Sequence, residues 1–408
     1  MASDPAEKIG WVSHVRLASS PSDATPLRIA GLFAGIGGIE EGFHNAGHET
    51  ALLCENDEAA VAVLGDRFSV PIAGDVRELE SVGNVDLVAA GFPCQDLSQA
   101  GRTAGITGGR SGLVQEVFRL VNGSSADWLL LENVPFMLQL ERGEAMRYLT
   151  SELADQGFTW AYRVVDSRAF GLPQRRRRVL LLASRSLDPR GVLFGEDAGE
   201  PATPAHKGRA CGFYWTEGIR GLGWAVDAIP TIKGGSSVGI PSPPAIWLPN
   251  GDLVLPDIRD AERLQGFSAD WTAPAVDDPQ RRNGPRWKLV GNAVSVPVSE
   301  WLGLRLGASP AWDPEAVEQK EFDSGASWPK AAWGGPGGSF AVDVSAWPVQ
   351  PKGDLDLAGF LEYPPRPLSE RAARGFLGRA ERSTLRFPDG LLDALRLHLK
   401  GFRAELAA

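Results

Sequence analysis

Cys94 is the residue of this sequence with the clearest capacity for covalent chemistry. It stands in a Gly-Phe-Pro-Cys-Gln turn, residues 91–95, directly after an apolar run. A thiol there can act as a nucleophile if its pKa is lowered, whereas an isolated cysteine is more often an inert, buried side chain. Five glycines follow between residues 101 and 112, which indicates a mobile loop able to close over a site.

A carboxylate and a run of arginines offer acid–base and charge-stabilising groups. Glu132 ends another apolar run, and in a closed pocket such a carboxyl can be protonated at neutral pH and donate a hydrogen bond. In water it would be an ordinary ionised strand-end residue. Four arginines, residues 175–178, precede a further apolar run. Such a cluster is usually a solvated basic face, but alternate side chains could instead point into a pocket.

A glycine-rich turn with an acidic residue downstream indicates a nucleoside cofactor. Residues 33–38 (FAGIGG) follow the first apolar run, and Glu55 stands twenty residues after Gly35, where it can accept hydrogen bonds from ribose hydroxyls. This spacing fits a dinucleotide or S-adenosylmethionine, and a tight turn without any ligand stays open. The G-x-G-G form and Glu40, which would repel a pyrophosphate, favour a cofactor without phosphate. Asp75 could bind an adenine amino group or be a surface turn residue.

These residues need a scaffold that brings strand ends together. Short, continuous apolar runs lie at residues 27–32, 50–54, 85–90, 128–131 and 179–183. Such runs are typical of strands buried on both faces, and helix-like stretches between them, at 57–68 and 143–156, indicate a doubly wound α/β sheet. Because the carboxyl ends of parallel strands line a ligand crevice, we expect the glycine turn, the thiol and the two carboxylates at one edge.

The apolar pattern changes after residue 186, so the chain divides into segments. We expect a flexible N-terminal arm at 1–25, a cofactor-binding domain at 26–189, an irregular, β-rich second unit at 190–256, a return segment completing the first domain at 257–308, and a C-terminal extension of unknown role at 309–408. The return segment shows a helical pattern at 257–267 and a strand-and-helix pattern at 287–306. Residues 309–360 resemble a linker or wrapped extension, and residues 367–403 look helical, with Ser369 as a candidate cap.

Composition bounds the partners. The 408 residues include 41 Lys and Arg against 51 Asp and Glu, and the formal net charge of −10 argues mildly against nucleic acid. Local basic clusters keep that partner open, because a DNA enzyme needs positive potential in its cleft rather than over its whole surface. No run of about 18 apolar residues and no secretory signal occur, so we expect no membrane association. Three cysteines fit a reducing cytoplasm, and the cysteine and histidine spacing predicts no metal site.

Eight motifs in a fixed order carry a family resemblance. They are FAGIGG at 33–38, the strand end at Glu55, GDV at 74–76, GFPCQ at 91–95, LENV at 131–134, FGLPQRRRRV at 170–179, ERLQGF at 262–267 and GNAVSVPV at 291–298. With these motifs, which cover about residues 27–306, the chain resembles the bacterial, restriction-modification type of DNA (cytosine-5) methyltransferase. Leu97 stands where the family often has Phe, and Ala293 where Ser is common. Neither departure removes a group that the reaction needs.

The resemblance implies a doubly wound, Rossmann-like domain that uses S-adenosylmethionine, a smaller β-rich target-recognition domain at 190–256, and a C-terminal extension. The implied cofactor-binding residues are Phe33, Gly35, Ile36, Gly38, Glu55, Asn56, Asp75, Val76, Pro93, Asn292 and Ala293. The implied catalytic residues are Cys94, Glu132, Arg176 and Arg178. The Cys94 thiolate would attack C6 of a cytosine flipped out of the duplex, with Glu132 at N3, Arg178 holding the base, and Arg176 supporting the loop or the phosphates.

Double-stranded DNA is the implied partner. The candidate contacts are Gln95, Ser98, Arg110, Thr231, Lys233, Ser236, Arg281 and Arg282, with Arg209 and Ser237 as further candidates. Arg286 and Lys288 extend a basic cluster at 281–288 that either faces phosphates or is a solvated loop. The arginine-rich C-terminus is expected to be a helical extension packed on the catalytic domain, and the alternative is an additional DNA-contacting arm.

Three other functions are alternatives to this interpretation. An RNA (tRNA) cytosine-5 methyltransferase could share the motifs, and a non-catalytic DNA-binding module could share the fold. A nucleotide-dependent oxidoreductase fits poorly with the G-x-G-G turn and with the Cys, Glu and Arg set. We expect a monomeric, cytoplasmic enzyme of bacterial or phage origin, with a companion restriction endonuclease or defence system as a possible partner.

Overall fold

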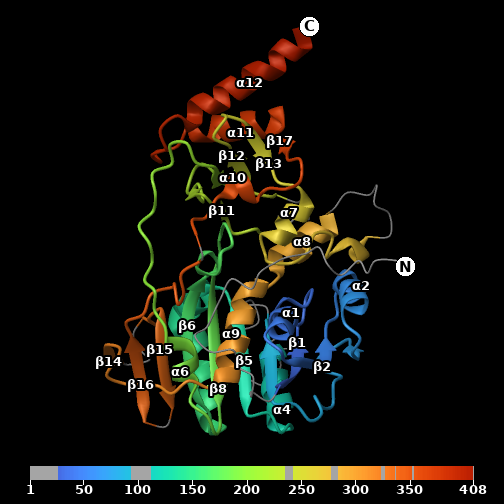
Figure 1. Cartoon of the computed structure of the whole chain (residues 1–408), viewed down its shortest axis with the longest axis vertical. Helices are drawn as coiled ribbons and strands as arrows, with labels where there is room; N and C mark the ends of the chain where they lie inside the picture. The colour runs from blue at the N-terminus through green and yellow to red at the C-terminus, as the bar shows by residue number, and fades with distance from the viewer. Residues whose placement is uncertain are drawn as a thin grey trace, which may run out of the picture.

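The computed structural model describes residues 26–92, 112–234, 242–276, 284–322, 327–335, 337–351 and 353–407. A large sheet with its helices forms one end of the molecule, and a small sheet with the C-terminal helices forms the other (Figure 1). This arrangement confirms the expected α/β fold with a smaller β-rich unit.

One half of the large sheet is parallel and contains the predicted strand ends. Its strands are β1 (Arg28–Leu32), β2 (Glu49–Cys54), β3 (Ile72–Ala73), β4 (Leu87–Ala90) and β5 (Trp128–Asn133). They lie in the order β3-β2-β1-β4-β5, so the winding direction reverses between β1 and β4, where a ligand crevice is expected. The helices described in this half are α1 (Gly38–Asn45), α2 (Glu58–Arg67), α4 (Leu113–Asn122) and α5 (Glu144–Asp155), the last preceded by the 3-10 segment η3 (Pro135–Gly143).

Strand register aligns the ends of these strands in one row. Leu32 pairs with Cys54 on one side and with Ala90 on the other, and Ala90 pairs with Leu131. The residues that follow these positions therefore stand at the same edge of the sheet, and the two predicted carboxylates are among them.

The other half of the large sheet is antiparallel, which differs from a uniformly doubly wound pattern. The apolar run at 179–183 belongs to β8 (Arg177–Ser184), which is antiparallel to β5 and to β6 (Thr159–Asp166). Only the short segments η4 (Ser167–Phe170) and β7 (Gln174–Arg175) separate β6 from β8. Because β8 runs opposite to β5, it begins where β5 ends, and the arginines at 175–178 reach the edge that holds Glu132.

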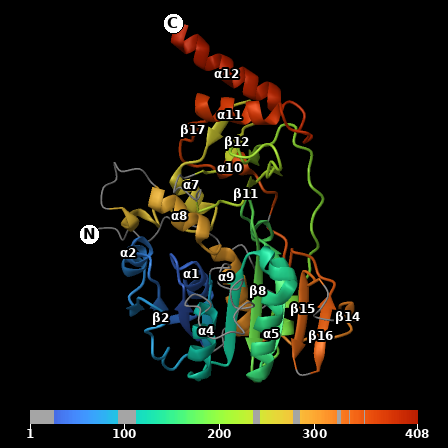
Figure 2. The ribbon, with the colours of Figure 1, turned by 180° about the vertical axis from the view of Figure 1, so that it is seen from behind.

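Of the two expectations for residues 309–360, a linker and a wrapped extension, the linker is wrong. These residues supply β14 (Gln319–Glu321), β15 (Ala331–Gly335) and β16 (Gly338–Val342), which extend the large sheet beyond β6 (Figure 2). Trp328 packs against Trp160 and Tyr162, with ring centroids 6.2 Å apart in both contacts. This tryptophan, expected in a linker or wrapped extension, is buried in the hydrophobic core.

The small sheet joins the predicted recognition region to the end of the chain. Its order is β10 (Ala225–Val226), β9 (Cys211–Phe213), β12 (Ala245–Trp247), β13 (Leu253–Leu255) and β17 (Arg366–Pro367). Helices α11 (Glu370–Ala380) and α12 (Leu391–Ala407) cover it, and Phe376 and Leu391 share a core with Phe213. Ser369 caps α11 as predicted. The expectation that these helices pack on the catalytic domain is wrong, because their apolar side chains are buried against the small sheet.

The return segment connects the two units through helices. These are α7 (Ile258–Arg263), α8 (Gly284–Asn292) and α9 (Val296–Ala308), with the short η5 (Ala273–Ala275) between the first two, so no strand forms at 287–306. Helix α9 lies so close to α1 that a Cβ on Gly42 would come within 2.5 Å of the Val296 carbonyl oxygen. The short helices α6 (Pro189–Phe194) and α10 (Leu357–Phe360) complete the fold, and β7 pairs in parallel with β11 (Ile229–Pro230). No helix in the described ranges is long and apolar enough to span a lipid bilayer.

Candidate active site

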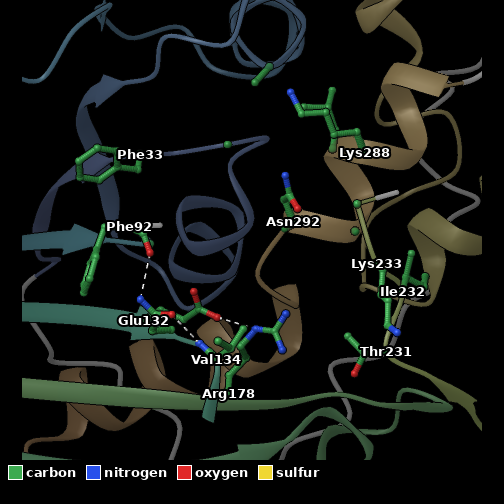
Figure 3. A pocket seen from close by; sticks show the side chains of 18 of the residues that line it. Phe33, Phe92, Glu132, Val134, Arg178, Thr231, Ile232, Lys233, Lys288 and Asn292 are labelled. Carbon is green, nitrogen blue, oxygen red and sulfur yellow. Dashed lines mark hydrogen bonds and ion pairs between the residues drawn. The ribbon is translucent and has the colours of Figure 1, made fainter. Parts of the chain in front are cut away.

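A cavity of about 1100 Å³ lies between the large sheet and the small unit. Its walls come from the ends of β1, β2, β4 and β5, the start of β8, residues 231–234 and helix α8 (Figure 3). The predicted site residues that line it are Phe33, Gly35, Glu55, Asn56, Glu132, Arg178, Thr231, Lys233, Asn292 and Ala293. Folding therefore brings the first and the last of the sequence motifs to one place.

Glu132 and Arg178 form an ion pair in this cavity. Arg178 Nε lies 2.9 Å from Glu132 Oε1, and the two side chains are only 12% and 9% exposed. Burial raises the pKa of the Glu132 carboxyl, and the positive charges of Arg178 and Arg176 offset part of the rise. A carboxyl whose pKa is raised stays protonated over a wider pH range, and in its protonated form it can donate a hydrogen bond to a ligand.

Backbone register and one asparagine position this pair. Glu132 stands opposite Leu180 in the β5–β8 ladder, two residues along from Arg178. Asn133 Nδ2 donates to the Phe92 carbonyl oxygen at 3.0 Å, which ties the end of β5 to a residue two positions before Cys94 (Figure 3). The carboxyl is thus held beside the chain that leads to the predicted nucleophile.

Arg176 lies behind the cavity wall. It is fully buried, and its guanidinium donates to the carbonyl oxygens of Ile232, Gly291 and Ala293. The neighbouring Gln174 is also buried and accepts from Ile232 N at 3.0 Å. These contacts make Arg176 a positioning residue that joins β8 to the 231–234 segment and to the α8–α9 junction.

The glycine turn at residues 33–38 holds Glu55 through backbone donors. Gly35 N donates to Glu55 Oε2 at 2.8 Å, and Asn56 N and Asp57 N donate to Oε1, each at 2.8 Å. Gly35 has a φ of 57°, a left-handed conformation that favours glycine. The carboxylate is therefore fixed in orientation, and its remaining lone pairs are available to a ligand in the cavity.

Glu40 lies under this turn. The side chain is 1% exposed, and a Cβ on Gly31 would come within 1.9 Å of its Oε1. Burial raises the pKa of Glu40 to about 7, and the charge of Glu55 adds to the rise. When they are ionised, the carboxylates at the turn make it a poor place for a pyrophosphate, because like charges repel.

Four cofactor candidates do not line the cavity: Ile36, Gly38, Asp75 and Val76. Ile36 and Val76 are 1% and 3% exposed and belong to hydrophobic cores, and Gly38 lies against a backbone carbonyl of the return segment. Asp75 is hydrogen-bonded to the side chain and backbone of Arg77, which lowers its pKa to about 2. A place in a motif therefore does not by itself bring a side chain into the cavity.

The recognition-side candidates are held by neighbouring side chains. Lys233 Nζ pairs with Glu217 Oε1 at 2.6 Å and lies 3.8 Å from the centroid of the Tyr214 ring. Tyr214 Oη donates to the Thr231 carbonyl oxygen at 2.7 Å, and Thr231 Oγ1 donates to the Arg175 carbonyl oxygen at 2.9 Å. This wall of the cavity is a network of contacts between the two units.

The two described basic side chains of the cluster at 281–288, Arg286 and Lys288, lie in different surroundings. Arg286 is 7% exposed, and its Nη2 lies 2.9 Å from both Glu262 and Asp270, so this side chain does not face phosphates. A buried guanidinium needs such carboxylate partners. Lys288 does line the cavity, where it pairs with Asp57 at 2.6 Å. Arg209 is paired with Asp227 and is not part of the lining.

Sequence reasoning missed several lining residues. Phe136, which is 59% exposed, and Tyr214 line the cavity. Arg175 and Arg177 also line it; both belong to the arginine run that the sequence singled out, but neither was among the site candidates. Phe136 follows the LENV motif by two residues, which could have drawn attention to it. Nothing in the sequence distinguishes Tyr214 from other aromatic residues of the recognition region.

Nine candidates lie outside the described residues: Pro93, Cys94, Gln95, Ser98, Arg110, Ser236, Ser237, Arg281 and Arg282.

The large sheet and its helices have the Rossmann-like fold that is found in known methyltransferases. The crystal structure of S. pombe Dnmt2 methyltransferase is similar, with a TM-score of 0.50 and 16% identity over 69% of this chain and 98% of that one.

The family can be stated more narrowly. Residues 27–203 match the C-5 cytosine-specific DNA methylase family. The chain is 49% identical to the Type II methyltransferase M2.BsuMI of Bacillus subtilis (strain 168), over 90% of this chain and 97% of the relative. It is 26% identical to the Type II methyltransferase M.DsaV of Dactylococcopsis salina, over 72% of this chain and 89% of that relative. The chain belongs to this family and is a DNA (cytosine-5-)-methyltransferase.

Proposed function

We propose that the enzyme transfers a methyl group from S-adenosylmethionine to C5 of a flipped-out cytosine in a specific double-stranded DNA sequence, through a covalent bond between Cys94 and C6. The buried Glu132–Arg178 pair carries this proposal. It offers a carboxyl that can be protonated and a guanidinium within one cavity, and these two groups match the polar edge of a single cytosine.

The size of the cavity supports two occupants. Small-molecule sites commonly measure about 300–1,000 Å³. The cavity of about 1100 Å³ exceeds that range, which fits a nucleoside cofactor together with one extruded base.

The residues at the glycine turn fit S-adenosylmethionine. The orientation of Glu55 suits ribose hydroxyls, and the Phe33 ring lines the cavity, where it can contact adenine. Asn56, Asn292 and Ala293 complete this wall. When bound, S-adenosylmethionine supplies an electrophilic methyl group on a positively charged sulfur, which suits a site with acidic residues better than a phosphate would.

The remaining steps belong to the protein's own residues. The Cys94 thiolate forms a bond to C6 of the cytosine, and the displaced electron pair moves towards N3, where Glu132 donates a hydrogen bond or a proton. C5 thereby becomes nucleophilic enough to accept the methyl group. Arg178 holds the base and stabilises the developing negative charge. A base then takes the C5 proton, the C5–C6 double bond forms again, and the bond between Cys94 and C6 breaks, which returns the thiolate.

The position of Cys94 in the chain supports its assignment as the nucleophile. It follows Ala90, the last residue of β4, by four positions, and β4 lies beside β5, whose end carries Glu132. A nucleophile carried by the segment that follows β4 is therefore attached to the strand next to the one that carries Glu132.

The small unit is proposed to read the target sequence. Thr231 and Lys233 bring this unit into the wall of the cavity, so a base extruded there is adjacent to it. The C-terminal helices support the small sheet, which favours a structural role over a separate DNA-contacting arm. Because relatives are named Type II methyltransferases, we propose that the enzyme protects DNA, as a monomer, against a companion restriction endonuclease.

Bisulfite sequencing of DNA from cells that express the protein tests this function. We expect unconverted cytosines in one sequence context, and none with the Cys94→Ala variant. Complete conversion with the wild-type protein, together with label transfer from S-adenosylmethionine to tRNA, would refute the DNA assignment.

A further inference from the structure

The cationic side chains that line the cavity differ in whether a carboxylate neutralises them. Five cationic side chains line it: Arg175, Arg177, Arg178, Lys233 and Lys288. Four of these have carboxylate partners, as described above for Arg178, Lys233 and Lys288. Arg177 pairs with Glu200 at 2.7 Å and with Asp166 at 3.2 Å. Within the part of the chain that the structure describes, the guanidinium of Arg175 has no hydrogen-bond or ion-pair partner.

Arg175 is nevertheless half-buried, which makes an unpartnered charge unfavourable. Burial lowers the pKa of its guanidinium, and repulsion from Arg168 adds to the effect. An anion from outside the protein would relieve both effects. Among the residues that the structure describes, Arg175 is thus the one cation of the cavity lining without a carboxylate partner.

The backbone of Arg175 fixes its place on the recognition side. It pairs with Pro230 where β7 meets β11, and its carbonyl oxygen accepts from Thr231 Oγ1. Figure 3 shows Thr231 on the opposite side of the cavity from Phe33. The side chain therefore starts from the joint between the two units, away from the glycine turn.

We propose that the guanidinium of Arg175 binds a backbone phosphate of the target DNA strand, next to the cytosine that enters the cavity. This inference rests on the proposed function, because it takes the bound molecule to be DNA. The guanidinium offers two parallel N–H donors to two phosphate oxygens, a geometry that an ammonium does not reproduce.

The carboxylate in the methionine part of S-adenosylmethionine is a second anion that could bind Arg175. The location of Arg175 beside β11 and Thr231 favours the phosphate. The two sources are separable, since the first affects DNA affinity and its salt dependence and the second affects cofactor affinity.

The experiment uses the full-length protein with Arg175→Gln, Arg175→Lys and, as a matched control, Arg177→Gln. Arg177 lies two residues away in the same cavity, but Asp166 and Glu200 already neutralise it. Affinity is measured by fluorescence anisotropy, at several salt concentrations, for a duplex that carries the site mapped by bisulfite sequencing. Calorimetry gives the affinity for S-adenosylmethionine.

For Arg175→Gln we expect about tenfold weaker DNA binding, and a slope of log K against log salt that is smaller in magnitude by about 0.9. Arg175→Lys should keep the wild-type slope while binding more weakly, and Arg177→Gln should keep the wild-type slope. Affinity for S-adenosylmethionine should not change in any variant.

Two results would overturn the inference while leaving the proposed function intact. One is a wild-type salt slope in Arg175→Gln. The other is a loss of cofactor affinity in Arg175→Gln without a loss of DNA affinity. A wild-type protein that methylates no DNA would instead refute the proposed function itself.

Discussion

The two walls of the cavity are built in different ways. On the proposed cofactor side, Glu55 is held by the backbone N–H groups of Gly35, Asn56 and Asp57. On the side proposed to read the DNA sequence, residues 231–234 are held by side chains from elsewhere, above all by Gln174 and Arg176. The first wall is a local turn, which a short motif can encode. The second wall is a joint between two units, whose geometry depends on contacts between distant segments.

The largest effect is expected at Glu132, which stands between the two walls. Glu132→Gln keeps the size of the side chain but removes the carboxyl proton, so turnover should fall by about a thousandfold. Because burial raises the pKa of Glu132, wild-type turnover should decline as pH rises through that pKa, and the variant should lose this decline. Steady-state transfer of labelled methyl groups measures both effects. An equal loss of affinity for S-adenosylmethionine would instead place Glu132 in the cofactor wall.

The recognition wall should depend on the C-terminal helices. Phe376 is fully buried in the core of the small unit, and Phe376→Ala should lower the free energy of unfolding by about 4 kcal/mol. DNA binding should weaken while affinity for S-adenosylmethionine persists. Denaturant unfolding and calorimetry test this pair of outcomes. Leu397→Ala provides the control, because Leu397 of α12 is 70% exposed. Equal losses of both affinities in Phe376→Ala would show that the walls are not separable.

The cofactor wall should show a pH-dependent stability through Glu40. Its pKa is about 7 in the folded protein against a usual 4.5, so its contribution to stability is complete below about pH 4.5 and is lost as pH rises through about 7. Above that range, the ionised carboxylate should lower the free energy of unfolding by up to about 3 kcal/mol. The difference in free energy of unfolding between Glu40→Gln and the wild-type protein should therefore favour the variant more at pH 8 than at pH 5. Urea unfolding at the two pH values measures this difference. Glu58→Gln, at an exposed position of α2, should not show this effect.

The smallest effect is expected at the joint itself. Arg176→Met leaves three buried carbonyl oxygens without their donor and should lower the free energy of unfolding by about 2 kcal/mol. Because these carbonyls belong to the 231–234 segment and to residues beside Asn292, the KM for DNA and the KM for S-adenosylmethionine should rise together. Arg177→Met is the matched control and should raise neither. A rise in only one KM would mean that Arg176 serves one wall alone.

Local patterns predicted the parallel half of the large sheet well. The run at 50–54 became β2, the run at 128–131 became the start of β5, and the stretch at 57–68 became α2, each within two residues. The side-chain positions of Glu55 and Glu132 followed, because both come directly after buried runs. These predictions needed only apolar runs, helix caps and the rule that parallel strands end at one edge.

Non-local pairing explains what the sequence did not reveal. Strand β15 pairs with β6, and β17 pairs with β13, but no local sequence pattern predicts either pairing. The same holds in the cavity, where Lys233 pairs with Glu217 and Arg176 bonds to three carbonyl oxygens. Contacts of this kind depend on the assembled fold, and the motif spacing carries no information about them.

The late strands of the large sheet have a consequence for how the protein is made. Tyr162 of β6 donates a hydrogen bond to Pro329, 167 residues further along the chain. During synthesis on the ribosome, the edge of β6 therefore stays unpaired until residues 331–334 have emerged, and an open strand edge invites association with other chains. In the small sheet, the edge of β13 stays unpaired still longer, until β17 has emerged. Nascent chains that stall between these points would expose one or both edges, so chaperone demand should peak late in translation rather than when the cofactor-binding motifs appear.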